Sequence, residues 1–226
     1  MNKKDMAKMV AMAGGLEVVP KALIHASTKS FKKKGLDVPL EELEKAVSGA
    51  KGRKISYENG GEATLKNLLL RKTSPKMVPG ELTSKITKGA VGPENVVHTA
   101  KGNPAINAHE IAHAKGPVGG GWKGSALYGA SNTGSSIMSS IAINKGLKGK
   151  ELSKKQRFLA AALALPQLAE ETRANVQAAK ALHRVGGKEA LKSGAPALIG
   201  SQLSYLANAA AAVGGDKIVK KALKKK

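Results

Sequence analysis

The chain has 226 residues and a formal net charge of +22, from 38 basic and 16 acidic side chains. This length is sufficient to bury one hydrophobic core. Aromatic residues make up only 3% of the chain, so the core must be built from alanine, leucine, isoleucine, valine and methionine, which favours closely packed helices over a large sheet. Cysteine is absent, which excludes disulfides and thiolate metal ligands.

The excess of positive charge predicts an anionic partner: nucleic acid, an acidic membrane surface or an acidic protein. Few aromatic residues interleave with the lysines, so the stacking platforms of many single-strand binders are not visible in the sequence. The lysine-rich segments 29–35 and 216–226 are the candidates for contact with an anion. The second segment has an alternative interpretation as a disordered, solubilising terminus.

The first third of the chain predicts helices followed by a hairpin. Residues 1–34 predict one or two helices broken at Gly14, and their apolar run is too short for a signal peptide. Residues 38–52 carry leucine and valine at helical spacing and predict a short amphipathic helix. Residues 53–70 predict a strand, a turn at residues 59–61 and a second apolar segment, as in a β-hairpin.

Residues 94–100 form the last predicted strand, and the rest of the chain predicts helices. These helices are expected at residues 104–115, 121–147, 151–183, 188–192 and 195–213. Pro166 is expected to break or kink the third of them. The fold class is therefore mostly α, in an α+β arrangement.

Two long uncharged stretches, residues 125–144 and 193–215, approach the length of about 20 residues that a membrane span requires. They are rich in serine, glycine, alanine and asparagine, which suits helices that approach closely at small side chains. This composition favours buried helices of a soluble domain, with membrane-embedded or membrane-adsorbed helices as the alternative.

The sequence HEIAH at residues 109–113 lies on a helix with clear end signals. Asn103 is expected to cap this helix, Pro104 to occupy its first position and Gly116 to follow its end. The helix prediction therefore does not depend on any chemistry of the motif.

The same motif indicates a zinc site. His109 and His113 lie one turn apart on one face, so their imidazoles can share a tetrahedral metal. Glu110 lies beside them, where its carboxylate can take a proton from a metal-bound water. The alternative is coincidence, but a chain of this composition would contain HExxH by chance in well under about one case in a hundred.

A third ligand must come from elsewhere in the chain. The metzincin continuation is excluded, because Gly119 stands where that pattern has its last histidine. Residues 168–182 carry acidic side chains on a predicted helix of small neighbours, with Glu171 on one stripe with Asn175. Glu170 is the competing third ligand, and its alternative interpretation is a solvated carboxylate paired with lysine or arginine.

At these residues the sequence resembles the gluzincins, in particular the neutral zinc metallopeptidases of the YugP type and, more distantly, the HtpX type. The resemblance rests on HEIAHAKG, on LPQLAEETRANVQAAKAL and on LSYLANAAAA, and it covers roughly residues 95–213. It implies a zincin-like helical domain with His109, His113 and Glu171 as zinc ligands and Glu110 as general base. It also implies Asn175 as a residue that supports the ligands, and it favours Glu171 over Glu170.

The chain is thus expected to contain a basic N-terminal region at residues 1–93, a metallopeptidase domain at 94–215 and a lysine-rich tail at 216–226. The expected activity is zinc-dependent hydrolysis of a peptide or protein substrate. His183 or Tyr205 is the candidate donor to the oxyanion, although each has an alternative interpretation as a packing or surface residue.

The strand at residues 94–100 is expected to offer an edge to an extended peptide, with His98 a strand residue rather than a metal ligand. The alternative function is that of a basic structural protein, associated with nucleic acid or an anionic membrane, whose zinc site is not catalytic. One form of this alternative is a protein packaged in a virus particle. The expected location is accordingly cytoplasmic, membrane-associated or within such a particle.

Overall fold

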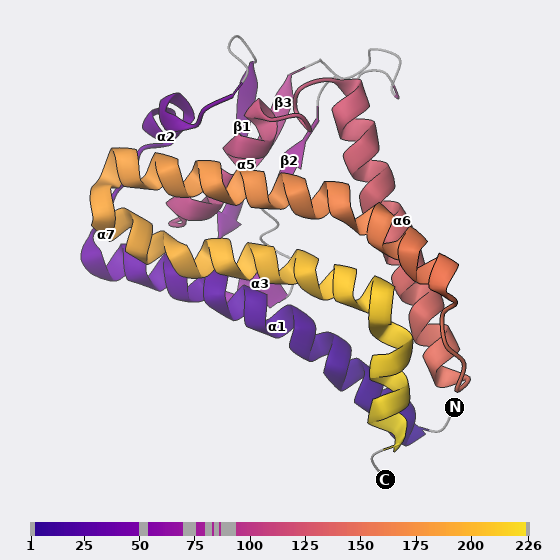
Figure 1. The fold of residues 1–226 in the computed structure, drawn as a ribbon. Helices are drawn as coiled ribbons and strands as arrows, with labels where there is room; N and C mark the ends of the chain where they lie inside the picture. Colours follow the sequence, from indigo (N-terminus) through magenta and orange to yellow (C-terminus); the bar gives the residue numbers. More distant parts are fainter. Residues whose placement is uncertain are drawn as a thin grey trace.

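Long helices form most of the protein, and a small sheet lies behind them (Figure 1). The computed structural model describes residues 3–49, 54–69, 76–79, 83, 86 and 94–224. Its elements are α1 (Lys3–Lys34), α2 (Leu40–Ala46), β1 (Ile55–Glu62), α3 (Leu65–Leu69), β2 (Lys76–Val78), β3 (Asn95–Lys101), α5 (Pro104–Lys115), α6 (Trp122–Leu147) and α7 (Lys154–Lys224). The prediction of a mostly helical α+β protein is confirmed.

The sheet has the strand order β1-β3-β2, with β1 parallel and β2 antiparallel to β3. The predicted hairpin at residues 53–70 is therefore wrong, because β1 continues to Glu62 and pairs with β3 instead of turning back. Gly60 is needed for this pairing rather than for a turn: a Cβ atom there would lie 2.4 Å from the carbonyl oxygen of Thr99. The predicted strand at residues 94–100 is confirmed as β3, but it is the central strand of these three and offers no edge.

Helix α1 runs without a break past Gly14, contrary to the prediction. It packs along the second half of α7, where Gly200 lies so close to α1 that a Cβ atom would come within 2.7 Å of the Pro20 carbonyl oxygen. Packing against α7 therefore stabilises α1, in addition to the helical propensity of its own residues.

Helix α7 consists of two antiparallel limbs, which appear in orange and yellow in Figure 1. Within α7, non-helical backbone angles occur at Gly187, where φ is 65°. We call residues 154–186 the first limb and residues 188–224 the second limb. The separately predicted helices at 188–192 and 195–213 are parts of this second limb.

The first limb continues through Pro166, so the expected helix break does not occur there. Ser131 of α6 supports the backbone at this point. Its hydroxyl donates to the carbonyl oxygen of Leu163 and accepts a hydrogen bond of 3.3 Å from the Gln167 amide. This side chain from a neighbouring helix thus bridges backbone groups beside the proline.

Helix α5 lies between the sheet and the first limb of α7, and the main core surrounds it. Many of its contacts are between small residues, which allow the two helices to approach closely; they include Ala105, Ala108, Ala112, Ala174, Ala178 and Ala181. Phe31 of α1 and Leu43 of α2 close this core at its ends. Among the described helices, none has a stretch that is both long enough and apolar enough to cross a membrane.

Candidate metal centre

His109 and His113 lie on one face of α5, as the sequence predicts. The Asn103 side chain caps the helix by accepting a hydrogen bond of 3.2 Å from the Ile106 amide. Both imidazoles are buried, with residue exposures of 2% for His109 and 5% for His113. Their Nε2 atoms are 3.1 Å apart, so the two potential ligand atoms point to the same spot.

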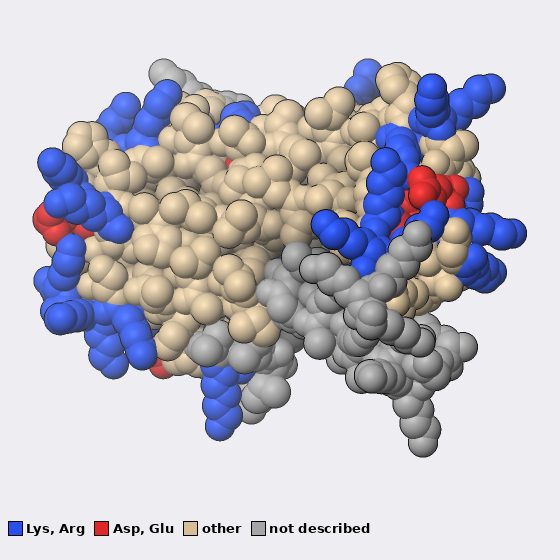
Figure 2. Space-filling model, turned by 60° about the horizontal axis from the view of Figure 1, so that its bottom comes forward, with Lys and Arg blue, Asp and Glu red and all other residues tan. Residues whose placement is uncertain are grey.

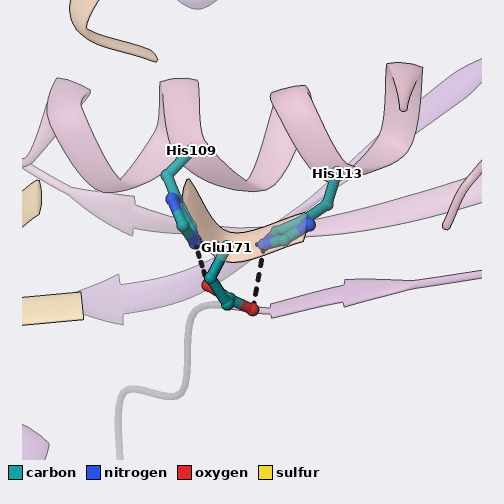
Figure 3. Close-up of side chains that lie close together, drawn as sticks. All are labelled: His109, His113 and Glu171. Atoms are coloured by element: carbon teal, nitrogen blue, oxygen red, sulfur yellow. Dashed lines mark hydrogen bonds and ion pairs between the residues drawn. The ribbon is translucent and has the colours of Figure 1, made fainter. Parts of the chain in front are cut away.

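Glu171 from the first limb of α7 reaches this spot from the opposite side (Figure 3). Its Oε2 atom lies 3.1 Å from His109 Nε2, and its Oε1 atom lies 3.4 Å from His113 Nε2. The carboxylate is completely buried. The structure therefore brings together the three residues for which a ligand role was expected, although 57 residues separate His113 from Glu171 in the sequence.

The geometry of these three side chains fits a zinc ion. Bonds of about 2.0–2.1 Å at tetrahedral angles place ligand atoms about 3.3 Å apart, close to the separations observed here. One atom from each of His109, His113 and Glu171 falls within 4.8 Å of the others. Oε2 of Glu171 has no hydrogen-bond partner in the protein despite its burial, as expected for an atom that binds a metal.

Glu170 faces the opposite ring nitrogen of His113. Its Oε1 atom lies 3.0 Å from His113 Nδ1, whereas Nε2 is the atom of that ring that lies near Glu171 and His109. Arg173 holds the same carboxylate with two hydrogen bonds of 2.8 and 2.7 Å, and it also donates to the Ala112 carbonyl oxygen at 2.6 Å. Glu170 is thus placed to orient the His113 ring, as carboxylates beside metal-binding histidines do, and not to be the third ligand.

Gly116 makes room for this arginine. A Cβ atom at residue 116 would lie only 1.8 Å from a terminal nitrogen of Arg173. The glycine that follows the histidine motif therefore has a packing role in addition to its role at the helix end.

The charged forms of His113 and Glu171 stabilise each other. Burial disfavours a charged imidazole, but the hydrogen bonds that the ring of His113 donates to Glu170 and Glu171 outweigh it and raise the pKa of His113 to about 10. Burial likewise disfavours the Glu171 carboxylate, yet the two histidines hold its pKa well below the usual value. Glu171 is therefore ionised at neutral pH, and in the absence of a metal His113 carries a proton that a metal would replace.

Glu110 borders a cavity of about 240 Å³ beside the three residues. His113, Tyr128 and Tyr205 line the cavity, together with Lys76 and Met77 of β2. Burial raises the pKa of Glu110, while a hydrogen bond from the Met77 backbone amide acts in the opposite direction. The carboxyl group of Glu110 thus lies on the cavity beside the candidate ligands, where it can exchange a proton with a bound molecule.

Tyr128 of α6 is the functional residue that the sequence did not single out. Its hydroxyl donates a hydrogen bond of 2.5 Å to Oε1 of Glu171 and lies 3.4 Å from the hydroxyl of Tyr205. Burial and the charge of Glu171 raise the pKa of both tyrosines, so both hydroxyls keep their protons. The Tyr128 hydroxyl donates its hydrogen bond to Glu171, so it can only accept from Tyr205. The Tyr205 hydroxyl can therefore donate to Tyr128 or to a molecule in the cavity.

One sequence signal could have identified Tyr128. The chain has only three tyrosines, and two of them meet at this centre. The third, Tyr57, donates a hydrogen bond of 2.6 Å to Glu44 elsewhere in the protein.

The described hydrogen bonds and ion pairs of the remaining candidates do not involve His109, His113 or Glu171. Asn175 donates from Nδ2 to Gln202 at 2.9 Å, and its buried Oδ1 atom has no hydrogen-bond partner, so no hydrogen bond joins it to either imidazole. His183 is exposed and lies about 18 Å along the helix from Glu171, so it is not a donor at this site. His98 pairs with Glu58 on β1 at 3.2 Å, in agreement with its interpretation as a strand residue.

Comparisons of the chain with models of protein families, with curated proteins and with solved structures found no match.

Proposed function

We propose that the protein is a zinc-dependent metallopeptidase with a zincin-like domain. The observation that carries this proposal is the convergence of His109 Nε2, His113 Nε2 and the Glu171 carboxylate beside Glu110. Two imidazoles and one carboxylate are a ligand set of catalytic zinc sites, which keep a fourth position open for water. The identification of the metal as zinc rests on this donor set.

A zinc ion held by His109, His113 and Glu171 would supply Lewis-acid chemistry, lowering the pKa of water and polarising a carbonyl group. Glu110 would take a proton from the attacking water and return it to the leaving amine, from its position on the cavity beside the three candidate ligands. Tyr205 faces the same cavity with a protonated hydroxyl and is the candidate donor to the oxyanion. Tyr128 and Glu170 hold Glu171 and His113, respectively, in position.

The substrate is proposed to bind along the edge strand β2. Lys76 and Met77 line the cavity, and β2 is at one edge of the three described strands. An extended peptide beside this strand would place a carbonyl group near Glu110. The edge function that the sequence suggested for residues 94–100 is thus reassigned to β2.

The test is cleavage of a mixed peptide library by zinc-loaded protein and by Glu110→Gln. The wild-type protein is expected to cleave peptides, and the variant to bind zinc with activity reduced by at least about a hundredfold. Equal activity in the variant, or no cleavage by zinc-loaded wild-type protein, would overturn the proposal.

A second candidate is a basic structural protein whose metal site only stabilises the fold. The distribution of lysine and arginine favours it, because these residues gather at both ends of the molecule (Figure 2). Whether the partner is nucleic acid or an anionic membrane, this function requires no proton transfer, so Glu110→Gln would leave it unchanged.

A further inference from the structure

The outer face of α7 carries exposed apolar side chains along both limbs. On the first limb the exposed residues are spaced by three and four, which places them on one stripe: Phe158, Ala162, Leu165, Ala169, Thr172 and Val176. The same spacing on the second limb gives Ile199, Leu203, Leu206 and Ala210. We call these ten residues, of which Thr172 alone is polar, the apolar face. Its large side chains are well exposed, at 78% for Phe158, 62% for Leu165 and 54% for Ile199.

The opposite sides of both limbs are also apolar and already lie in the core. Ala160, Ala174 and Ala178 of the first limb and Ala197 and Ala212 of the second are completely buried. A helix that is apolar on both sides is normally covered on both. The two stripes form one surface, because the limbs are joined near it by a hydrogen bond of 3.3 Å from Gln202 to Thr172.

Lysines stand at both ends of each stripe. Lys154 and Lys155 precede the first stripe and Lys180 follows it, while Lys192 precedes the second stripe and Lys217 follows it; all are exposed. Glu170 and Glu171, which fall within the first stripe in sequence, point inward and are buried. Figure 2 shows the resulting pattern, in which basic side chains gather at the two ends of the molecule and a broad, nearly uncharged band lies between them.

We propose that the apolar face adsorbs to the surface of an anionic lipid bilayer, with α7 parallel to the membrane. The first stripe extends over about 27 Å from Phe158 to Val176, at 1.5 Å per residue. Along this length apolar side chains enter the boundary between headgroups and acyl chains, while the lysines at both ends reach lipid phosphates. The attraction of a strongly basic protein to an anionic surface adds to the apolar contact.

The positive charge of the protein makes a second copy of the chain an unsuitable partner for the apolar face. Each stripe ends in lysine at both ends, so parallel and antiparallel pairing of two stripes both place lysine against lysine. Two molecules of formal charge +22 also repel each other as a whole. Nucleic acid is a poor match for a different reason, since the uncharged middle of the face offers nothing to a phosphate backbone.

The test is co-sedimentation of the full chain with vesicles of phosphatidylcholine, with and without phosphatidylserine, at low and at physiological salt. Binding is expected only with phosphatidylserine present. The double variant Phe158→Ser/Leu165→Ser is expected to bind about tenfold more weakly or worse. Ile86→Ser is the matched control, because Ile86 is 73% exposed and lies outside α7; this variant is expected to bind like the wild type.

A second variant, Lys154→Gln/Lys155→Gln/Lys180→Gln, is expected to weaken binding and reduce its dependence on salt. Circular dichroism verifies that each variant keeps its helices. Three results would overturn the proposal: no binding to phosphatidylserine vesicles at low salt, unchanged binding of the Phe158/Leu165 variant, or a dimer in light scattering that this variant dissociates. The last result would assign the face to a second copy of the chain.

Discussion

Tyr128 donates its hydroxyl proton to Oε1 of Glu171 at 2.5 Å, while Oε2 of the same carboxylate faces His109 at 3.1 Å. The hydrogen bond occupies one carboxylate oxygen and leaves the other for a metal. In the proposed site, Glu171 would thus bind the metal through one oxygen, as in zinc sites that combine three protein ligands with an open position.

Tyr128→Phe tests this arrangement. Without the hydroxyl, both carboxylate oxygens can approach the metal, so we expect a change in coordination number together with a loss of peptidase activity. The absorption spectrum of the cobalt-substituted protein reports the coordination number directly. Tyr57→Phe is the matched control, since it removes a hydroxyl that binds Glu44 away from the centre. An unchanged cobalt spectrum in Tyr128→Phe would contradict this role.

Glu170→Gln tests the support of His113. The amide keeps the size of the side chain but weakens its bond to His113 Nδ1, and metal affinity is expected to fall by about 10–100-fold. A competition titration with a chelator measures the effect. Glu189→Gln, at an exposed glutamate of the same helix that pairs with Lys34, is expected to leave the affinity unchanged. A complete loss of the metal in Glu170→Gln would instead identify Glu170 as a ligand.

The difference between Glu170 and Glu171 shows where sequence reasoning ends. Both residues were recognised as acidic side chains on one predicted helix, but neighbouring residues point about 100° apart, so only one can reach the Nε2 atoms of His109 and His113. Which one does so depends on how the first limb is rotated against α5, and this rotation is fixed by small residues such as Ala112, Ala174 and Ala178 that pack between the helices.

The helix of His109 and His113 could be predicted because its signals are local: Asn103 caps it and the histidine spacing defines one face. The rarity of tyrosine marks Tyr128 as unusual, but its contact with Glu171 could not be predicted, since that contact depends on the packing of α6 against α7. The predicted hairpin failed for a related reason. Asn-Gly-Gly is a turn signal, but at Gly60 the same small residue serves the close pairing of β1 with β3.

Metal binding is expected to release a proton. In the absence of a metal the pKa of His113 is about 10, so this imidazole is protonated at neutral pH and must lose its proton before Nε2 can bind zinc. Apparent affinity should therefore rise by about tenfold per pH unit between pH 6 and pH 8. Calorimetry in buffers of different ionisation enthalpy measures the protons released. Proton release near zero, with affinity independent of pH, would contradict the charge assigned to His113.

Asp216 is expected to stabilise the fold far from the metal centre. It is fully buried and accepts hydrogen bonds from Arg157 at 3.0 and 2.6 Å and from the Leu152 amide at 2.7 Å. Asp216→Asn removes the charge that pairs with Arg157 at 2.6 Å. We expect the free energy of unfolding at pH 7 to fall by about 2 kcal/mol.

The pH dependence of this effect has a definite sign. Burial opposes ionisation of Asp216, but the hydrogen bonds from Arg157 and Leu152 lower its pKa below the unfolded value. The stabilisation is thus fully present above pH ~4 and is lost as the pH falls through the folded pKa. Denaturant titrations of wild type and Asp216→Asn should differ at pH 7 and converge in strong acid. A difference that stays constant into strong acid would contradict the assignment.

The central claim is that His109, His113 and Glu171 hold one zinc ion, and metal analysis of purified protein dialysed after zinc loading tests it most directly. We expect about one zinc per chain in the wild type and in His183→Ala, a control at an exposed histidine of α7, and almost none in His113→Ala and Glu171→Ala. The account would be contradicted by wild-type protein without stoichiometric zinc, or by a Glu171→Ala variant that retains it.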